Sequence, residues 1–164
     1  MPGIKLIKKE NYPCLNYIIN RLLEPDIKKH LFDDYMGISE ITALLYSGNT
    51  IVYGLFQKGL PEPFGCVFFT GVVPYRDCYL FGAIFDRENR NQGKATEIYE
   101  LIYKDIIERF SVSSATANVI GKNLASIKIL EKIGFKKIGI KPKAIMVEGK
   151  KKDLTIYYIL EEEA

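Results

Sequence analysis

Residues 90–96 form a short polar run, Arg-Asn-Gln-Gly-Lys-Ala-Thr, between an apolar, strand-like stretch at 79–85 and a periodic helix at 95–110. Gly93 and the small Ala95 let the main chain approach a ligand closely. The first turn of the helix offers amide groups without helical partners, together with the positive end of the helix dipole. These features predict a cradle for a phosphate or pyrophosphate group. A tight connection that binds nothing is the alternative interpretation.

A second helix, expected at residues 124–133, completes the pattern. Asn123 stands at its N-cap, Ser126 lies in its first turn, and Gly134 ends it. If this helix and the one at 95–110 line one cleft, Asn123 and Ser126 face the phosphate site. Asn123 is then either a helix cap alone or a cap that also contacts the ligand.

Together, the pattern Arg90-x-x-Gly93-x-Ala95-Thr96-Glu97 and the segment 123–135 resemble the GNAT superfamily of N-acetyltransferases, in particular its ribosomal-protein N-terminal acetyltransferase (RimJ/RimL-like) branch. The resemblance covers about residues 79–160. It implies acetyl-coenzyme A as cosubstrate, a primary amine as acceptor, and direct acetyl transfer in a ternary complex without a metal. It also implies that strands 4 and 5 splay, which leaves main-chain groups to pair with the pantetheine amides. The coenzyme contacts that it implies are Ile84, Phe85, Arg90, Asn91, Gln92, Gly93, Lys94, Ala95, Thr96 and Asn123.

Acetyl transfer from a thioester needs a neutral amine, a stabilised oxyanion and a proton for the leaving sulfur. Many relatives carry a tyrosine on the second helix for that proton; the matching residue here is Leu130, so the resemblance points to Ser126. Relatives often carry a glutamate on the fourth strand, where this chain has Tyr79, with Asp77 nearby. Tyrosine, with a reference pKa of about 10, is a weak base, whereas an α-amine near 8 needs little help. We expect Ser126 and Tyr79 as catalytic residues, and an acceptor amine of low pKa.

Asp33, Asp34 and Tyr35 fall in a loop between early helices, which the resemblance assigns to the acceptor pocket. Their charges suit a cationic amine, and solvated surface charges are the alternative. His30, the single histidine, is expected on a helix surface or partly packed rather than in catalysis. The acceptor is left open among a peptide N-terminus, a polyamine, an aminoglycoside and a small metabolite.

The order of elements predicts one domain over residues 1–164 with mixed α+β layers. The resemblance adds a mostly antiparallel sheet of about six to seven strands with about four helices. Strand 5 should run parallel to strand 4, because a helix joins them. The third helix should take Ser39 as its N-cap. Strands are expected at 3–8, 50–57, 63–70, 78–85, 114–119, 144–147 and 154–160, and helices at 13–23, 26–32, 39–47, 95–110 and 124–133.

Composition sets the remaining expectations. Hydrophobic residues at 48% and charged residues at 26% describe an ordinary globular protein, and a net charge of +3 does not favour nucleic acid. Three cysteines without metal-like spacing indicate a reducing cytoplasm and no zinc site. No leader or membrane span is expected.

Three alternatives stay open from the sequence. A non-catalytic acyl-coenzyme A-binding module is the alternative function, because the usual tyrosine and glutamate are missing. A nucleic-acid-associated role for the lysine-rich last quarter is the second. A homodimer that pairs strand 154–160 with its copy is the remaining one.

Overall fold

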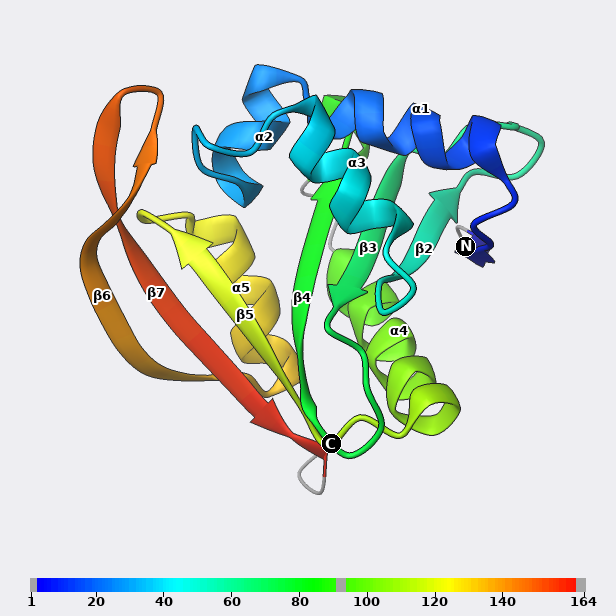
Figure 1. Ribbon diagram of the computed structural model, residues 1–164. Helices are drawn as coiled ribbons and strands as arrows, with labels where there is room; N and C mark the ends of the chain where they lie inside the picture. The colour runs from blue at the N-terminus through cyan, green and yellow to red at the C-terminus, as the bar shows by residue number, and fades with distance from the viewer. Residues whose placement is uncertain (1–2, 91–93, 162–164) are drawn as a thin grey trace.

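The computed structural model describes residues 3–90 and 94–161, which form one mixed sheet with helices on both faces (Figure 1). The strands are β1 (Gly3–Ile7), β2 (Ile51–Phe56), β3 (Gly65–Thr70), β4 (Asp77–Ile84), β5 (Ser114–Ile120), β6 (Lys136–Val147) and β7 (Lys150–Leu160). The helices are α1 (Tyr12–Leu22), α2 (Pro25–Leu31), α3 (Ile38–Tyr46), α4 (Ala95–Phe110) and α5 (Leu124–Ile133), with a short 3-10 helix, η1 (Arg87–Asn89). The expected α+β class is confirmed, and the described residues form the five α-helices that the local pattern predicted, where the resemblance implied about four.

The seven strands of the sheet lie in the order β1-β2-β3-β4-β5-β7-β6. Every neighbouring pair is antiparallel except β4 and β5, which run parallel as the helical connection between them predicts. β4 and β5 pair only from Asp77 to Tyr79 on β4 and from Ser114 to Thr116 on β5. Beyond those residues the two strands diverge, as Figure 1 shows for the green and yellow arrows. The expected splay of strands 4 and 5 is therefore present.

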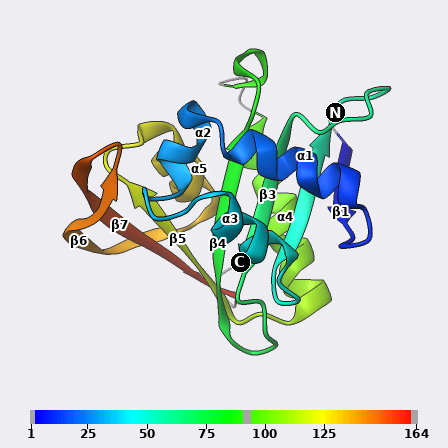
Figure 2. The ribbon, with the colours of Figure 1, turned by 45° about the horizontal axis from the view of Figure 1, so that its top comes forward.

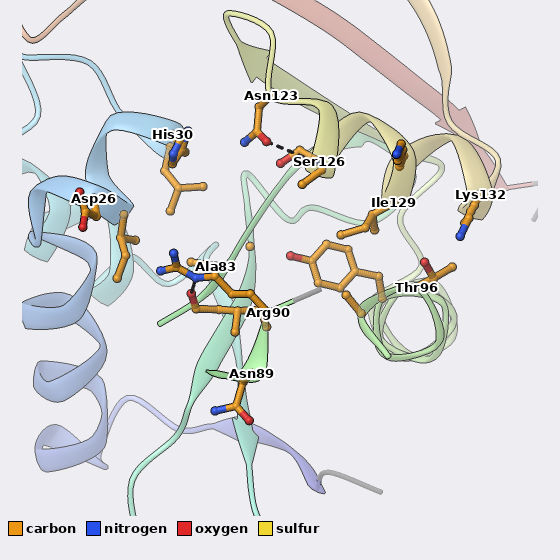
Figure 3. A pocket seen from close by; sticks show the side chains of 18 residues that line it. Asp26, His30, Ala83, Asn89, Arg90, Thr96, Asn123, Ser126, Ile129 and Lys132 are labelled. Carbon is orange, nitrogen blue, oxygen red and sulfur yellow. Dashed lines mark hydrogen bonds between the residues drawn. The ribbon is translucent and has the colours of Figure 1, made fainter. Parts of the chain in front are cut away.

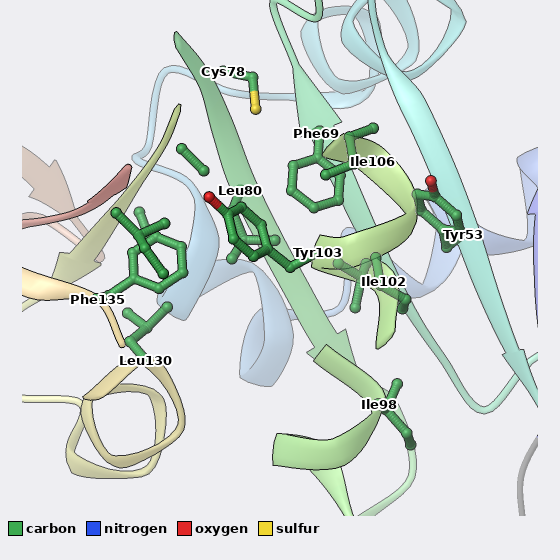
Figure 4. Packing of buried hydrophobic residues seen from close by; sticks show 14 of the residues in the cluster. Tyr53, Phe69, Cys78, Leu80, Ile98, Ile102, Tyr103, Ile106, Leu130 and Phe135 are labelled. Carbon is green, nitrogen blue, oxygen red and sulfur yellow. The ribbon is translucent and has the colours of Figure 1, made fainter. Parts of the chain in front are cut away.

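Two hydrophobic cores lie on opposite faces of the sheet. α1, α2 and α3 cover one face, whereas α4 and α5 cover the other (Figure 2). On the α4 side, Ile102 and Ile106 pack against Phe69 and Leu80 (Figure 4). On the α1 side, the ring of Phe68 stacks on Phe81 with centroids 4.8 Å apart. Alternate side chains of β3 and β4 thus enter different cores, as the period of two in a strand requires.

The helix ends follow mostly from local sequence. The Asn11 side chain accepts a hydrogen bond from the Cys14 amide at the start of α1, and Asn123 does the same for Ser126 at the start of α5. Gly134 ends α5 in the left-handed conformation that glycine tolerates best. The expectation of Ser39 as an N-cap was wrong, because the N-cap of α3 is Gly37, two residues earlier. There the Gly37 amide donates to the Glu40 carboxylate at 2.9 Å.

The C-terminal hairpin differs most from expectation. Its strands β6 and β7 are 12 and 11 residues long and include the lysines that flank the predicted short strands. β7 pairs with β5 on one edge and with β6 on the other, so it offers no free edge for pairing with a second copy. The expected dimer contact through residues 154–160 was therefore wrong, since β6, and not β7, is the strand of the hairpin that lies at an edge of the sheet. In the described part of the chain, no helix has the length and apolar character to cross a membrane.

Candidate active site

One carboxylate links β4 to β5 at the end where the two strands still pair. Asp77 accepts hydrogen bonds from the hydroxyls of Ser114 and Thr116, each at 2.7 Å. These bonds join the first residues of β4 to β5 through side chains as well as through the ladder. Above this point the strands share no ladder pairs among the described residues, and a wedge opens between them.

A cavity of about 520 Å³ lies over the open end of the wedge, between α2, β4, the start of α4 and one side of α5 (Figure 3). A smaller one of about 60 Å³ continues into the wedge itself, between Leu80–Gly82 on β4 and 117–119 on β5. His30, Gly82, Tyr99, Asn123 and Ser126 line both spaces. The helices therefore bring one continuous site to the point where the sheet is split.

The charges that line the larger cavity are mostly positive. Arg90, Lys128 and Lys132 contribute cations, and Asp26 is the single carboxylate among the described lining residues. Figure 3 shows Lys132 on the same side of the cavity as Thr96, near the start of α4. Such a lining attracts a polyanionic ligand, and a narrow, largely apolar extension suits an uncharged arm attached to it. The donor set thus fits coenzyme A, whose phosphates would meet the cations while the pantetheine arm enters the wedge.

Arg90 also holds the end of β4. Its Nε donates to the Ile84 carbonyl at 2.9 Å, and a terminal guanidinium nitrogen donates to the Phe85 carbonyl at 3.2 Å. The Phe85 amide donates to the Phe64 carbonyl at 2.8 Å, and the Phe85 side chain is only 3% exposed. The main-chain groups expected to meet a pantetheine arm at Ile84 and Phe85 are therefore largely engaged within the protein. Ile84 still lines the cavity, whereas Phe85 does not.

The other predicted coenzyme contacts divide into three groups. Ala95, Thr96, Arg90 and Asn123 line the cavity, and Lys94 precedes α4 as an exposed residue outside the lining. Asn91, Gln92 and Gly93 lie outside the described residues. The Asn123 side-chain oxygen accepts from the Ser126 amide at 3.3 Å, so Asn123 is a helix cap that also faces the cavity.

Of the two predicted catalytic residues, the structure brings only Ser126 to the cavity. Tyr79 is 45% exposed and lies on the face of β4 that carries Phe81, outside the lining. Leu130, which stands where relatives place a tyrosine, is 5% exposed and lines the inner end of the wedge. A proton donor for a leaving sulfur must therefore come from another position.

The predicted acceptor loop contacts the C-terminal hairpin. The Asp34 carboxylate accepts from the amides of Glu148 at 2.8 Å and Gly149 at 3.0 Å, and the Asp34 amide donates to the Met146 carbonyl at 2.8 Å. These two amides lower the pKa of Asp34. Asp33, Asp34 and Tyr35 do not line the cavity, and Asp34 has a structural partner in place of a ligand.

The sequence interpretation missed two residues of the site. His30 lines both parts of the cavity while it stays open to solvent, and partial burial, with the charges of Lys29 and Arg90, lowers its pKa. Tyr99 lines both parts as well, and burial raises its pKa. The helical period placed both residues on helices, but it gave no signal of what each side chain faces. Across the described residues, no group of three or more His, Cys, Asp or Glu side chains is suited to a metal ion.

Comparison with known proteins agrees with this geometry. Residues 68–156 match the model of the acetyltransferase (GNAT) domain. Over 81 residues, the chain is 30% identical to the "Probable N-acetyltransferase YjcK" of Bacillus subtilis (strain 168). The match covers 49% of the chain and 45% of that protein, so the chain spans less than half the length of this curated relative.

Solved structures share the fold over nearly the whole chain. Spermidine N-acetyltransferase from Vibrio cholerae, in complex with CoA and spermine, superimposes with a TM-score of 0.80 at 15% identity, over 98% of this chain and 96% of that one. Ribosomal-protein-S5-alanine acetyltransferase from Vibrio fischeri gives a TM-score of 0.75 at 15% identity, over 98% and 93%. At such identities the likeness concerns the fold alone.

Proposed function

Because the chain belongs to the acetyltransferase (GNAT) domain family, we propose that it is an N-acetyltransferase that moves an acetyl group from acetyl-coenzyme A to a primary amine. The observation that carries this proposal is the cavity of about 520 Å³ that continues into the wedge between β4 and β5. Its cationic rim suits the phosphates, and its narrow end suits a thioester placed against the split sheet.

The residues around the cavity offer groups for each chemical need of the reaction. His30, whose pKa is lowered, is neutral near pH 7 and open to solvent, so it can take a proton from the acceptor ammonium. Main-chain amides of β4 beyond Tyr79, where the strand has no ladder pair with β5, can donate to the developing oxyanion. Ser126 presents a hydroxyl to both parts of the cavity and is a candidate donor to the leaving sulfur. We assign no proton transfer to Tyr79, which stands outside the lining.

We further propose an acceptor amine of low pKa, such as a peptide N-terminus, as in the RimJ/RimL-like branch that the two motifs resemble. An α-amine with a pKa near 8 needs only a weak base, and a histidine at the cavity mouth is sufficient for it. A lysine side chain near 10.4 would need more assistance than the described lining offers. A polyamine is the second candidate, because a spermidine N-acetyltransferase in complex with CoA and spermine shares the fold. Its primary amines, like that of lysine, would need a stronger base than an α-amine does.

Calorimetry with acetyl-coenzyme A tests the first step of this proposal. We expect binding with a Kd of about 10 µM or tighter. Replacement of Ala95, which lines the cavity at the start of α4, by tryptophan should abolish binding. Glu97→Trp, on the exposed side of the same turn, is the matched control and should bind normally. Absence of heat from the wild-type protein at millimolar acetyl-coenzyme A would overturn the proposal.

Thiol release with a panel of amines then separates an enzyme from a binding module. Peptides with free N-termini, polyamines and lysine-containing peptides with blocked N-termini are the three classes to compare. We expect release with the first class to exceed release with the blocked peptides. Binding of acetyl-coenzyme A without thiol release from any amine would favour the non-catalytic acyl-coenzyme A-binding module.

A further inference from the structure

We propose that Tyr99 on α4, rather than Ser126, donates the proton that the leaving sulfur needs, in place of the tyrosine that relatives carry at the position of Leu130. This inference rests on the proposed function and adds a catalytic residue to it. Tyr99 lines both parts of the cavity, as do Asn123 and Ser126 at the start of α5.

The Tyr99 hydroxyl lies directly against the main chain of β4. A Cβ atom built on Gly82 would overlap the Tyr99 hydroxyl oxygen and crowd the ring carbon that carries it. A side chain at residue 82 would therefore displace the hydroxyl, which glycine leaves in place. Gly82 lies on the part of β4 that has no ladder pair with β5, so the hydroxyl stands within the wedge.

The surroundings of Tyr99 keep it a hydrogen-bond donor. Its hydroxyl makes no hydrogen bond to any described residue, which leaves its proton free for a ligand. Burial, and to a lesser degree the nearby Cys66, raises the pKa of Tyr99, so the phenol stays protonated at neutral pH. The charged and titratable groups that share the lining are His30 and Asp26 on α2, Arg90 before α4, and Lys128 and Lys132 on α5.

The protons and electrons of the acetyl transfer balance when Tyr99 first donates a proton and then accepts one. Tyr99 gives its proton to the sulfur as the C–S bond breaks, and the electron pair of the neutral amine forms the new C–N bond. The proton that the nitrogen must then lose restores the Tyr99 hydroxyl. The products are the amide and the free thiol, and the net proton released is the one first taken from the acceptor ammonium.

A second tyrosine on the same helix supplies a matched control. Tyr103, one turn after Tyr99, carries a buried hydroxyl that has no hydrogen-bond partner among the described residues. It packs in the core beside Phe135, with ring centroids 6.0 Å apart, and lines neither part of the cavity (Figure 4). Tyr99→Phe and Tyr103→Phe each remove one hydroxyl from α4, and only the first removes one from the wedge.

Turnover is the first readout. Tyr99→Phe should lower kcat by about 100-fold or more, as loss of a proton donor usually does, while the Kd for acetyl-coenzyme A changes by less than about threefold. Tyr103→Phe should keep kcat within about twofold. Gly82→Ala should lower kcat as much as Tyr99→Phe, and the double variant should show no further loss, because both changes remove the same hydroxyl.

Binding of free coenzyme A is the second readout and does not depend on turnover. A hydroxyl beside the sulfur stabilises the thiolate, so coenzyme A should bind the wild-type protein more tightly at pH 9.5 than at pH 7. Tyr99→Phe should lose that gain, and Tyr103→Phe should keep it. The inference is overturned if Tyr99→Phe retains both kcat and the pH-dependent gain. If the wild-type protein releases no thiol with any amine yet shows the Tyr99-dependent gain, the proposed function fails while the placement of the hydroxyl stands.

Discussion

Arg90 acts on the protein's own main chain. The spacing of its motif predicts a contact with phosphate, yet its guanidinium bridges the carbonyls of Ile84 and Phe85, where β4 ends. A guanidinium presents five donors in a fixed fork, so two can hold the strand while others still face the cavity. One side chain therefore links the shape of the wedge to the charge of the cavity rim.

Arg90→Lys should separate these two contributions, because lysine keeps the charge but not the fork. We expect a loss of about 1–3 kcal/mol in the free energy of unfolding, measured with urea, from the two charge-assisted hydrogen bonds. Weaker binding of acetyl-coenzyme A should accompany it. Arg76→Lys, at an exposed position, is the control and should change stability by less than about 0.5 kcal/mol. Weaker binding at unchanged stability would show instead that Arg90 contacts only the ligand.

His30 gives a second residue-scale prediction, which proton NMR can read without ambiguity because the chain has one histidine. Partial burial and the charges of Lys29 and Arg90 outweigh Asp26 and Glu148, so its titration midpoint should fall below the usual 6.5. The unfolded chain then binds the proton first. Stability should fall as the pH drops below about 6.5 toward the folded pKa. His30→Gln should remove that slope, and a midpoint above 6.5 would contradict the assignment of a neutral imidazole.

At the scale of elements, the loop after α2 and the β6–β7 turn are fastened together although they are far apart in the sequence. Asp34 supplies three of the hydrogen bonds between them, two through its carboxylate and one through its amide. The acidic loop therefore positions the hairpin beside α2. The sequence of the acidic loop alone is compatible with a ligand site and with solvated surface. It does not indicate the observed role, because the amides that Asp34 binds belong to a turn far away in the sequence.

Because the two turn amides lower the pKa of Asp34, their contribution to stability has a defined pH window. It is fully present above the unfolded pKa of about 3.9 and is lost as the pH falls through the lower folded pKa. The protection factors of the Glu148 and Gly149 amides against hydrogen exchange should fall in that window, and Asp34→Ala should lower them already at neutral pH. Asp153→Ala, which frees only the Lys143 amide, is the control. Equal protection in Asp34→Ala and wild type would exclude the clamp.

At the scale of the whole molecule, sequence periodicity predicted where helices and strands lie far better than it predicted which residues contact one another across the fold. The order of strands and helices, the parallel β4–β5 pair and the caps at Asn123 and Gly134 follow from local patterns. The lengths of β6 and β7 do not, because lysines on exposed strand faces interrupt the apolar alternation. The Gly82–Tyr99 contact joins residues from a strand and a helix, and no local rule links their positions.

The two-sided core makes the middle of the sheet the most sensitive place for stability. Phe68 is 0% exposed and stacks on Phe81 under α2, so Phe68→Ala should lower the free energy of unfolding by about 3–5 kcal/mol. That is a large part of the roughly 5–15 kcal/mol of a typical domain. Tyr35→Ala, at a residue 78% exposed, should stay within about 0.5 kcal/mol. Denaturant titration of both variants measures these losses. Similar losses of unfolding free energy for the two variants would contradict the assigned core.

The short contact between β4 and β5 has a mechanical consequence. Within the sheet, three ladder pairs and the Asp77 carboxylate join the four-stranded block to the three-stranded block, and the core on the α4 side packs against both. Tension applied by optical tweezers between residues 84 and 120, at the open ends of the two strands, would peel these pairs one after another toward Asp77. A ligand arm seated between the strands would load both blocks at once, so the rupture force should rise when the site is filled.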